Sequence, residues 1–414
     1  MLHLTLAASL ALLASCASLV HALPAPVVSD STIHGDVPTI SNADGTVNPH
    51  LLRRNLHQTF AKYSFGPLTA AATTNSSTRA EPAAGLYTAG MSFGSPPQGR
   101  NLILDTGSTD LFIQEKCAQG AGCAPNYLPR SSATYRTTGR TTTLNYVSDS
   151  VTGRVVTDRV TFGGRTVENQ AFLVVPDSNT PGASGNIGLG LNAHANPTIG
   201  TPLLENLRAT GQLGNGNSFA LQLDRTGNSA AVTLGLKTGP GAFTLPYSTY
   251  NVMYPELLGR WALEMKTVSS LDNKSQWRDS VAVFIDSGAA SSFVPRAAAR
   301  VAHSQVEHQV ETVQIPLQGQ VYDVDFYFYP CNATIDYYIQ FTDSRTFRAD
   351  PRDQSVGSDG NGMCQSMLNG VDIEYNGLKA GILGAPWLKS KQAIFAVGSD
   401  SSNTGATISF WDGM

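Results

Sequence analysis

The sequence contains two copies of one short pattern, in which an apolar run is followed by aspartate, a small hydroxyl residue and glycine. The first copy is LILDTGSTDLF at 102–112, with its acid at Asp105, and the second is VAVFIDSGAASSFVP at 281–295, with its acid at Asp286. A single copy fits a strand that ends in an Asx turn, because aspartate readily accepts hydrogen bonds from the backbone that follows it. A carboxylate beside a buried strand is costly to desolvate unless its charge is stabilised or used. The repeat therefore indicates a duplicated half-molecule in which two carboxylates meet face to face.

A second repeated element supports this duplication. After further strand-like sequence, the first aspartate is followed by Asn186-Ile187-Gly188 and the second by Ile382-Leu383-Gly384. The chain has 414 residues, which is enough for two sizeable lobes. We therefore expect two lobes related by a pseudo-twofold axis, with the two acids between them.

Local patterns predict a mostly β fold with antiparallel hairpins. Runs rich in Val, Thr and Phe alternate with glycine turns, as in RVVTDRVTFGG at 154–164 and SFALQLDRTGNSAAVTLG at 218–235. Helical patterns are few. One is TPLLENLRATGQL at 201–213 and the other is VPRAAARVAHSQ at 294–305, each with a proline near its start.

Several classes of function find little support. The net charge is −4 and we see no basic patch, so nucleic acid is not an expected partner. The residues His194, His303 and His308 lack the ligand spacing of a zinc hydrolase, and we expect His303 and His308 on a solvated helix end and its loop. No Gly-x-Ser-x-Gly elbow indicates a Ser-His-Asp hydrolase. We therefore expect neither a metal nor a cofactor.

The N-terminal part of the chain has the features of a removable leader. Residues 1–22 carry a short apolar run that ends in Val20-His21-Ala22, which predicts a secretory signal peptide. Leu13-Ala14-Ser15-Cys16 also resembles a lipoprotein cleavage site, and an uncleaved anchor is a third reading. The run lacks a basic start and is short for a membrane span, so the signal peptide is preferred. No later stretch is long and apolar enough to span a membrane.

Residues 23–80 lose the strand pattern and gain proline, serine, threonine and alanine. A disordered linker would explain that composition. The middle of this region, HLLRRNLHQTFAKYSFG at 50–66, is basic and amphipathic, unlike its flanks. A pro-peptide that docks on the protein and is later cut away explains both features better.

Cysteines and glycosylation sequons indicate an oxidising compartment. Loss of the signal peptide would remove Cys16 and leave an even set of cysteines. These are Cys117, Cys123, Cys331 and Cys364. Asn-x-Ser/Thr sequons, which fit glycosylation in that compartment, begin at Asn75, Asn273 and Asn332. We expect a secreted protein, with a vacuolar location as the second choice.

Two carboxylates within hydrogen-bond distance cannot both ionise cheaply, so such a pair holds one shared proton over a wide acidic range. The ionised member can take a proton from a water between them, and the protonated member can polarise a carbonyl and then protonate the leaving nitrogen. This is amide hydrolysis without a covalent intermediate. Thr106 and Ser287, next to the acids, are placed to hydrogen-bond between the lobes and hold the carboxyls coplanar. Gly107 and Gly288 allow close backbone approach and can donate to the carboxylates.

Four segments together resemble the pepsin-like aspartic proteases, of the secreted fungal type. They are LILDTGSTDLF, FIDSGAASSFVP, GNIGLG and GILGAPWL. The resemblance covers about residues 81–414, in the family's order and spacing. It implies a mostly β, bilobal fold with a cleft between an N-terminal catalytic lobe, residues 81–242, and a C-terminal catalytic lobe, residues 243–414.

The resemblance also implies roles for individual residues. Asp105 and Asp286 are the implied catalytic pair of an aspartic endopeptidase that works at acidic pH. The implied supporting residues are Thr106, Gly107, Ser108, Ser287 and Gly288. Polypeptides are the expected substrates, pepstatin-type compounds are the expected inhibitors, and a monomer is the expected state.

Further roles concern the flap, the disulfides and the pro-segment. Tyr146 matches the tyrosine of a hairpin flap that closes over substrate, with Ser148 and Asp149 beside it; an ordinary strand tyrosine is the alternative. The implied disulfides are Cys117–Cys123 and Cys331–Cys364. Lys62 and Tyr63, in AKYSFG, match a pro-segment latch whose ammonium lies between the carboxylates. A solvated basic residue in a disordered leader is the alternative for Lys62.

Four departures from the family pattern bear on activity. Phe112 replaces the usual tryptophan and cannot donate a hydrogen bond to the flap tyrosine. Val147-Ser148-Asp149-Ser150 replaces a glycine-rich flap tip, so the flap should be stiffer and carry an acid. Ala289 replaces the hydroxyl residue three positions after Asp286, and Asn186 is polar where it could alter a specificity pocket. These differences keep a second reading open, a catalytically inactive pepsin-fold binding protein.

Overall fold

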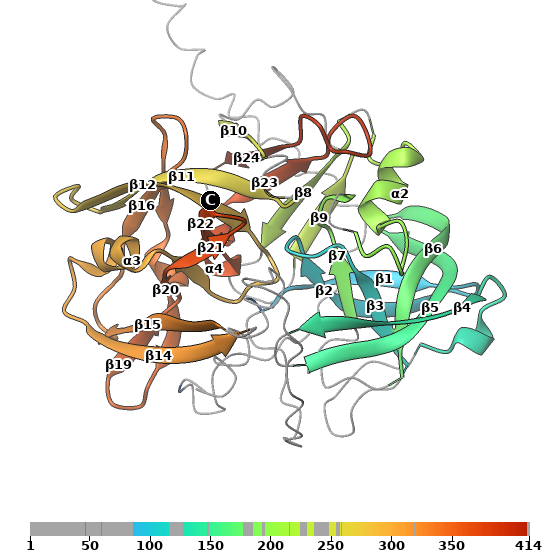
Figure 1. Cartoon of the computed structure of the whole chain (residues 1–414), viewed down its shortest axis with the longest axis horizontal. Helices are drawn as coiled ribbons and strands as arrows, with labels where there is room; N and C mark the ends of the chain where they lie inside the picture. Colours follow the sequence, from blue (N-terminus) through green and yellow to red (C-terminus); the bar gives the residue numbers. More distant parts are fainter. Residues whose placement is uncertain are drawn as a thin grey trace, which may run out of the picture.

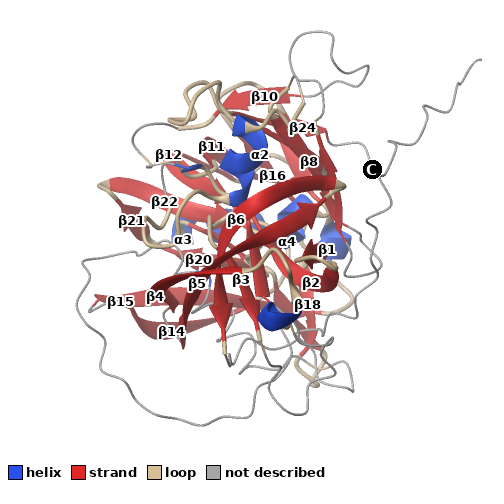
Figure 2. Ribbon diagram, turned by 90° about the vertical axis from the view of Figure 1, so that its right-hand side faces the viewer, coloured by secondary structure: helices blue, strands red, loops and turns tan. Residues whose placement is uncertain are grey.

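In the computed structural model, the described residues are 46, 59, 86–115, 127–146, 149–176, 185–192, 195–214, 216–223, 230–235, 248–253, 257, 259–317 and 320–411. The predicted signal peptide lies outside them, as does the predicted pro-peptide apart from Thr46 and Thr59. Strands dominate the described part of the chain (Figure 2) and form two bodies, on the left and right of Figure 1. The mostly β, bilobal fold expected from the sequence is confirmed.

A seven-stranded sheet forms the first body, on the right of Figure 1. In spatial order its strands are β1 (Thr88–Phe93), β2 (Gln98–Asp105), β7 (Gly185–Gly188), β3 (Leu111–Gln114), β6 (Arg165–Val175), β5 (Asp149–Phe162) and β4 (Arg136–Tyr146). Strand β1 also pairs with β5, so the sheet curls back on itself. Its core includes Phe93, Tyr127 and Phe172, whose ring centroids lie 5.1 to 5.9 Å apart. The hairpin expected at 154–164 is the β5–β6 connection.

A twelve-stranded sheet forms the second body. In spatial order ten of its strands are β17 (Thr346–Ala349), β16 (Tyr337–Gln340), β11 (Ala262–Ser270), β12 (Gln276–Ile285), β22 (Leu378–Leu383), β13 (Ser292–Val294), β20 (Leu368–Val371), β15 (Gln320–Pro330), β19 (Met363–Ser366) and β18 (Ser355–Ser358). Two strands extend it sideways, β14 (Gln309–Leu317) on β15 and β21 (Ile373–Tyr375) on β22.

A five-stranded sheet joins the two bodies, because it combines strands from both parts of the chain. In spatial order they are β10 (Ser248–Asn251), β24 (Thr407–Trp411), β23 (Gln392–Ala396), β8 (Ser218–Leu223) and β9 (Ala230–Leu234). Phe219 of β8 stacks on Phe395 of β23 with ring centroids 4.9 Å apart, and Trp261 packs edge-on against both rings. The expected boundary between residues 242 and 243 lies outside the described residues.

The two predicted helices are present but shorter than their sequence patterns. They are α2 (Leu203–Ala209), which buries Leu203, Leu204 and Leu207, and α3 (Arg296–His303). A third helix, α4 (Ala385–Leu388), is a single turn and too short to leave a periodic pattern in the sequence. Short 3-10 turns lie at Pro129–Ser131 and Pro351–Asp353.

The expectation that His303 lies on a solvated helix end is wrong. His303 is the last residue of α3 and is 0% exposed, because this turn of the helix packs against the second sheet. Its ring stacks on Tyr327 at a centroid distance of 4.0 Å and hydrogen-bonds Ala299 O at 2.7 Å and Ser366 Oγ at 2.9 Å. Burial lowers the pKa of His303 to about 3; the charge of His308 acts in the same direction, and the contact with the Ala299 carbonyl opposes it.

A disulfide joins Cys331, just after β15, to Cys364 of β19. It is one of the two pairs implied by the family resemblance, and it lies within the second body. The other pair, Cys117 and Cys123, is outside the described residues.

His303 should make folding stability depend on pH. The unfolded chain binds a proton on this histidine below about pH 6.5, whereas the folded chain binds it only near pH 3. Its contribution to stability is therefore present above the unfolded pKa and declines as the pH falls toward the folded pKa. Between pH 7 and pH 5 we expect a loss of about 2 kcal/mol in the free energy of unfolding from this group.

The measurement is urea unfolding of the original protein and of His303→Gln at pH 7 and pH 5. The variant should be less stable overall but lose about 2 kcal/mol less between the two pH values. Gln170→Leu, a change at a buried amide in the first body, should lower stability and keep the original pH dependence. Equal pH dependence in His303→Gln and the original protein would contradict the assignment.

Candidate active site

The two motif aspartates occupy equivalent places in the two sheets. Asp105 is the last residue of β2, and Asp286 directly follows β12. In each sheet one strand runs parallel to the aspartate strand in the same register, with Leu104 opposite Ile187 and Ile285 opposite Leu383. Those strands, β7 and β22, lead into the glycines of the second repeated element. The arrangement supports the duplication predicted from the sequence.

Both glycines of that element are required by close backbone contacts. A Cβ atom on Gly188 would lie 2.3 Å from the carbonyl carbon of Thr109, and one on Gly384 would lie 2.4 Å from Ser291 O. In each body, therefore, the loop that follows the aspartate passes directly over the paired strand. No larger residue fits there without moving the backbone.

The two aspartate turns hold each other through exchanged hydrogen bonds. Thr106 Oγ1 donates to Ile285 O at 2.8 Å and accepts from Ser287 N at 2.9 Å. In return, Ser287 Oγ donates to Leu104 O at 2.8 Å and accepts from Thr106 N at 3.1 Å. All four bonds are buried. Each turn thus satisfies polar backbone groups of the other, as expected for Thr106 and Ser287.

Glycine after each hydroxyl residue brings backbone up to the carboxylates. Gly107 N donates to Asp105 Oδ1 at 2.9 Å, and Gly288 N donates to Asp286 Oδ1 at 2.8 Å. A Cβ atom on Gly107 would lie only 2.6 Å from Asp286 Cγ. The first turn is therefore in contact with the carboxyl group of the other body, which places the two acids at one site.

The third residue after each aspartate differs between the two bodies. Ser108 Oγ donates to Asp105 Oδ2 at 2.5 Å, so both oxygens of this carboxylate have a donor. Ala289 takes the equivalent place after Asp286 and is fully buried in an apolar cluster. The methyl group of Ala289 cannot donate the hydrogen bond that Ser108 donates to Asp105.

Two further charged residues lie at the site, and neither was singled out from the sequence. Arg260 is buried and its Nη1 donates to Gly107 O at 2.7 Å. Asp110 is only partly exposed, and its loss of contact with water raises its pKa to about 6. The negative charge of Asp105 also raises this pKa, and the positive charge of Arg260 lowers it. Asp110 lies inside the first motif, five residues after Asp105, which is a usable signal. Arg260 belongs to no motif, and only the fold brings it to the site.

The predicted flap is the hairpin of β4 and β5. Tyr146 is paired with Asp149 at its end, but only the backbone of these two residues is described. Ser148 and Val147, at the tip, lie outside the described residues. Phe112, which replaces the family's tryptophan, packs in an apolar cluster with hairpin residues that include Leu144 and Val151. The hairpin is therefore held by apolar contacts two residues from its tip-proximal pair, Tyr146 and Asp149.

The remaining predicted residues belong to the glycosylation sequons and to the pro-segment latch. Asn273 and Asn332 are exposed, so both sequons are accessible. Those outside the described residues are Lys62, Tyr63 and Asn75.

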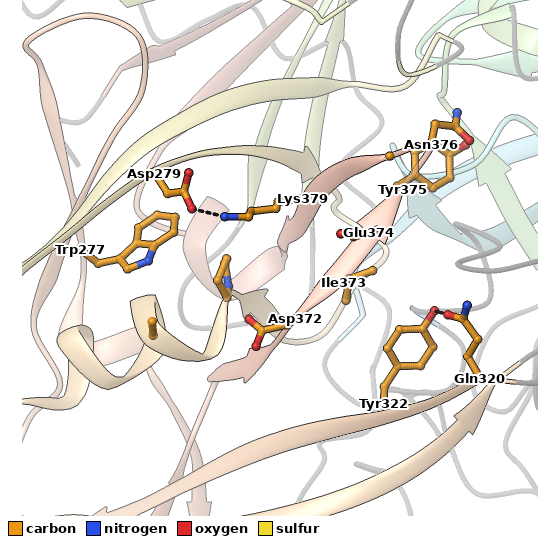
Figure 3. A pocket seen from close by; sticks show the side chains of 13 residues that line it. Trp277, Asp279, Gln320, Tyr322, Asp372, Ile373, Glu374, Tyr375, Asn376 and Lys379 are labelled. Atoms are coloured by element: carbon orange, nitrogen blue, oxygen red, sulfur yellow. Dashed lines mark hydrogen bonds and ion pairs between the residues drawn. The ribbon is translucent and has the colours of Figure 1, made fainter.

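A polar cavity of about 840 Å³ lies elsewhere on the second body (Figure 3). Its walls include Trp277 and Asp279 of β12, the start of α3 and the β21–β22 hairpin, and Asp279 forms an ion pair with Lys379. The residues that line it include neither Asp105 nor Asp286, so the motif acids do not serve this cavity.

Across the described ranges, no group of three or more His, Cys, Asp or Glu side chains could hold a metal ion. No helix within those ranges is long and apolar enough to cross a membrane.

Comparisons with known proteins point to one family. The family model described as eukaryotic aspartyl protease matches residues 86–406. Similar curated proteins include the probable aspartic-type endopeptidase opsB of Aspergillus oryzae, which is 29% identical over 232 residues, 51% of this chain and 47% of the relative. Cathepsin E-B of Xenopus laevis is 34% identical over 132 residues, 30% of this chain and 32% of the relative. Gastricsin of Homo sapiens is 33% identical over 138 residues, 32% of this chain and 33% of the relative. The chain thus spans between about a third and half the length of these relatives.

Replacing Thr106 with valine should destabilise the junction between the two bodies. Valine has nearly the same shape but cannot accept from Ser287 N or donate to Ile285 O, so two buried backbone groups lose their partner. We expect the free energy of unfolding to fall by about 2–4 kcal/mol. The control is Thr143→Val, which makes the same change at an exposed Thr143–Thr152 hydroxyl pair. Equal stability of the two variants, measured by urea unfolding, would show that the exchanged bonds contribute little.

Proposed function

Because the chain belongs to the eukaryotic aspartyl protease family, we propose that it is an aspartic endopeptidase in which Asp105 and Asp286 activate a water to hydrolyse peptide bonds. One observation carries the proposal: the carboxyl group of Asp286 lies against Gly107, in the turn that directly follows Asp105. The exchanged bonds of Thr106 and Ser287 hold this arrangement rigid. A reaction that needs an acid and a base at one point is served by such a fixed pair.

The mechanism follows from the coupling of two close carboxyl groups. They hold one proton between them over the acidic range, since two negative charges at this distance repel. The ionised group removes a proton from the water as it attacks the peptide carbonyl. The protonated group polarises that carbonyl and later supplies a proton to the departing nitrogen.

The charges around the pair favour work at acidic pH. Asp110 has a pKa of about 6, so below that pH it is neutral and no longer adds a negative charge beside Asp105. An ionised Asp105 is therefore easier to maintain at pH 5 than it would be next to a charged Asp110.

The second reading, an inactive pepsin-fold binding protein, has less support. Loss of catalysis commonly follows loss of an aspartate or of its donor, and this chain keeps both. Asp105 accepts from Gly107 N, and Asp286 accepts from Gly288 N.

We further propose that the protein is a secreted monomer made as a zymogen and inhibited by pepstatin-type compounds. Residues 1–22 would be the signal peptide and residues 23–80 the pro-peptide, with Lys62 and Tyr63 as its latch. Two described residues of that segment support docking: Thr46 forms a parallel β-bridge with Ser358, and Thr59 is fully buried. A vacuolar location remains the second choice.

Replacing either aspartate by asparagine should abolish hydrolysis. Asp105→Asn or Asp286→Asn leaves one carboxyl group, which cannot serve as base and acid at once, so kcat should fall by about 10³-fold or more. The assay is cleavage of a denatured protein at acidic pH, with and without pepstatin. Asp279→Asn, in the separate cavity, is the matched control and should retain activity. Substantial pepstatin-sensitive turnover by either active-site variant would refute the assignment.

Restoring a hydroxyl beside Asp286 should extend activity to lower pH. A donor to the ionised carboxylate lowers its pKa, so in Ala289→Thr the acid side of the kcat/KM profile should move down by about half to one pH unit. Ala289→Val adds the same bulk without a donor and should leave the profile in place. Matching profiles for the two variants would show that the missing hydroxyl does not set the acid limit.

A further inference from the structure

Asn186, on β7, contacts the hydroxyl group that donates to Asp105. Its side chain is 5% exposed, and its Nδ2 donates to Ser108 Oγ at 3.0 Å and to Asp110 O at 3.1 Å. Ser108 Oγ in turn donates to Asp105 Oδ2 at 2.5 Å. The three side chains form a continuous buried chain of hydrogen bonds that ends on a proposed catalytic oxygen.

The direction of this chain is fixed by what each group can do. The carbonyl oxygen of Asp110 can only accept, so the amide nitrogen of Asn186, and not its oxygen, faces these partners. An amide nitrogen can only donate, so Ser108 Oγ must be the acceptor in that contact. The single hydroxyl hydrogen of Ser108 is then directed to Asp105. Polarised in one direction, the chain stabilises a negative charge on Asp105.

The second body contains the same position without these donors. Asn186 lies opposite Phe112, and Ile382 lies opposite Phe293 in the same antiparallel arrangement. Ile382 thus takes the place of Asn186, just as Ala289 takes the place of Ser108. Ala289, Ile382 and Phe293 belong to one apolar cluster. The hydroxyl and the amide behind it are both present in one body and both replaced in the other.

We infer that Asn186 is a positioning residue of the reaction: by orienting Ser108 it stabilises ionised Asp105 and lowers the acid limit of peptide hydrolysis. The inference rests on the proposed endopeptidase function. The charged groups near Asp105 include Asp286 from the second body, Asp110 from the loop before β3 and Arg260, from the segment before β11, which binds the Gly107 carbonyl. A change at Asn186 replaces none of these charged side chains, but it also removes the hydrogen bond to Asp110 O. A variant cycle with Ser108 separates the effect through the hydroxyl from any effect through Asp110.

The experiment is a double-mutant cycle on the activated full-length protein, with the kcat/KM profile against pH as the readout. Asn186→Leu keeps the branched shape of the side chain and removes the donor. Its acid-side pKa should rise by about half to one unit. Ser108→Ala should raise that pKa by at least as much. The double variant should match Ser108→Ala alone, since Asn186 acts only through the hydroxyl.

The matched control is Gln170→Leu. Gln170 is a fully buried amide on β6 that donates to Ala171 O and Thr201 O and accepts from Asn206 Nδ2. Its loss should lower stability without moving the acid limit, which separates positioning from a merely structural role. Asn186→Ala, which removes both donors without adding a charge, should shift the acid limit in the same direction as Asn186→Leu. It replaces Asn186→Leu in the cycle if that variant does not fold.

The outcomes separate the inference from the proposed function. An unmoved acid limit in the Asn186 variant, or a double variant whose shift is the sum of the single shifts, would overturn the inference while the original protein remains active. No pepstatin-sensitive hydrolysis by the original protein would instead refute the proposed function, and the inference with it.

Discussion

The exchange of hydroxyl groups between Thr106 and Ser287 is the interaction on which the proposed site depends. A turn that follows a buried strand leaves polar backbone groups away from water, and such groups are costly unless they are paired. Here each turn supplies the partners that the other lacks. The five-stranded sheet serves the same end, because it ties both bodies into one hydrogen-bonded structure.

The surroundings of the two acids are less alike than their backbones. Near Asp105 lie the Ser108 hydroxyl, the Asn186 amide behind it, the Arg260 guanidinium and the Asp110 carboxyl group. In the second body, Ala289 takes the place of Ser108 and Ile382 takes the place of Asn186. Hydrogen-bond donors favour the ionised form of a carboxyl group, and apolar neighbours favour the neutral form. In the proposed mechanism, this difference would favour the shared proton on Asp286 before substrate binds.

Much of the fold and part of the site could be predicted from the sequence, for identifiable reasons. Glycines that contact a carboxylate or a crossing backbone leave no room for a side chain, so the motif must contain glycine there and can be recognised in the sequence. Hairpins such as β5–β6 are local, and their alternating residues and glycine turns identify them. Arg260 and Asn186 act through contacts between segments distant in sequence, which no pattern displays. The burial of His303 could not be predicted, because the sequence at the end of an amphipathic helix does not show which of its side chains pack against the sheet.

The shared register of β2–β7 and β12–β22 also has a consequence for symmetry. Two identical subunits related by a twofold axis must carry the same residue at every equivalent position. A substitution that helps the aspartate acting as base in one subunit is then also present beside the aspartate acting as acid in the other subunit. Covalent fusion of the two halves removes that constraint. Ser108 can then lie beside one acid and Ala289 beside the other. A single chain can therefore give each acid different neighbours, one set suited to a base and the other to an acid.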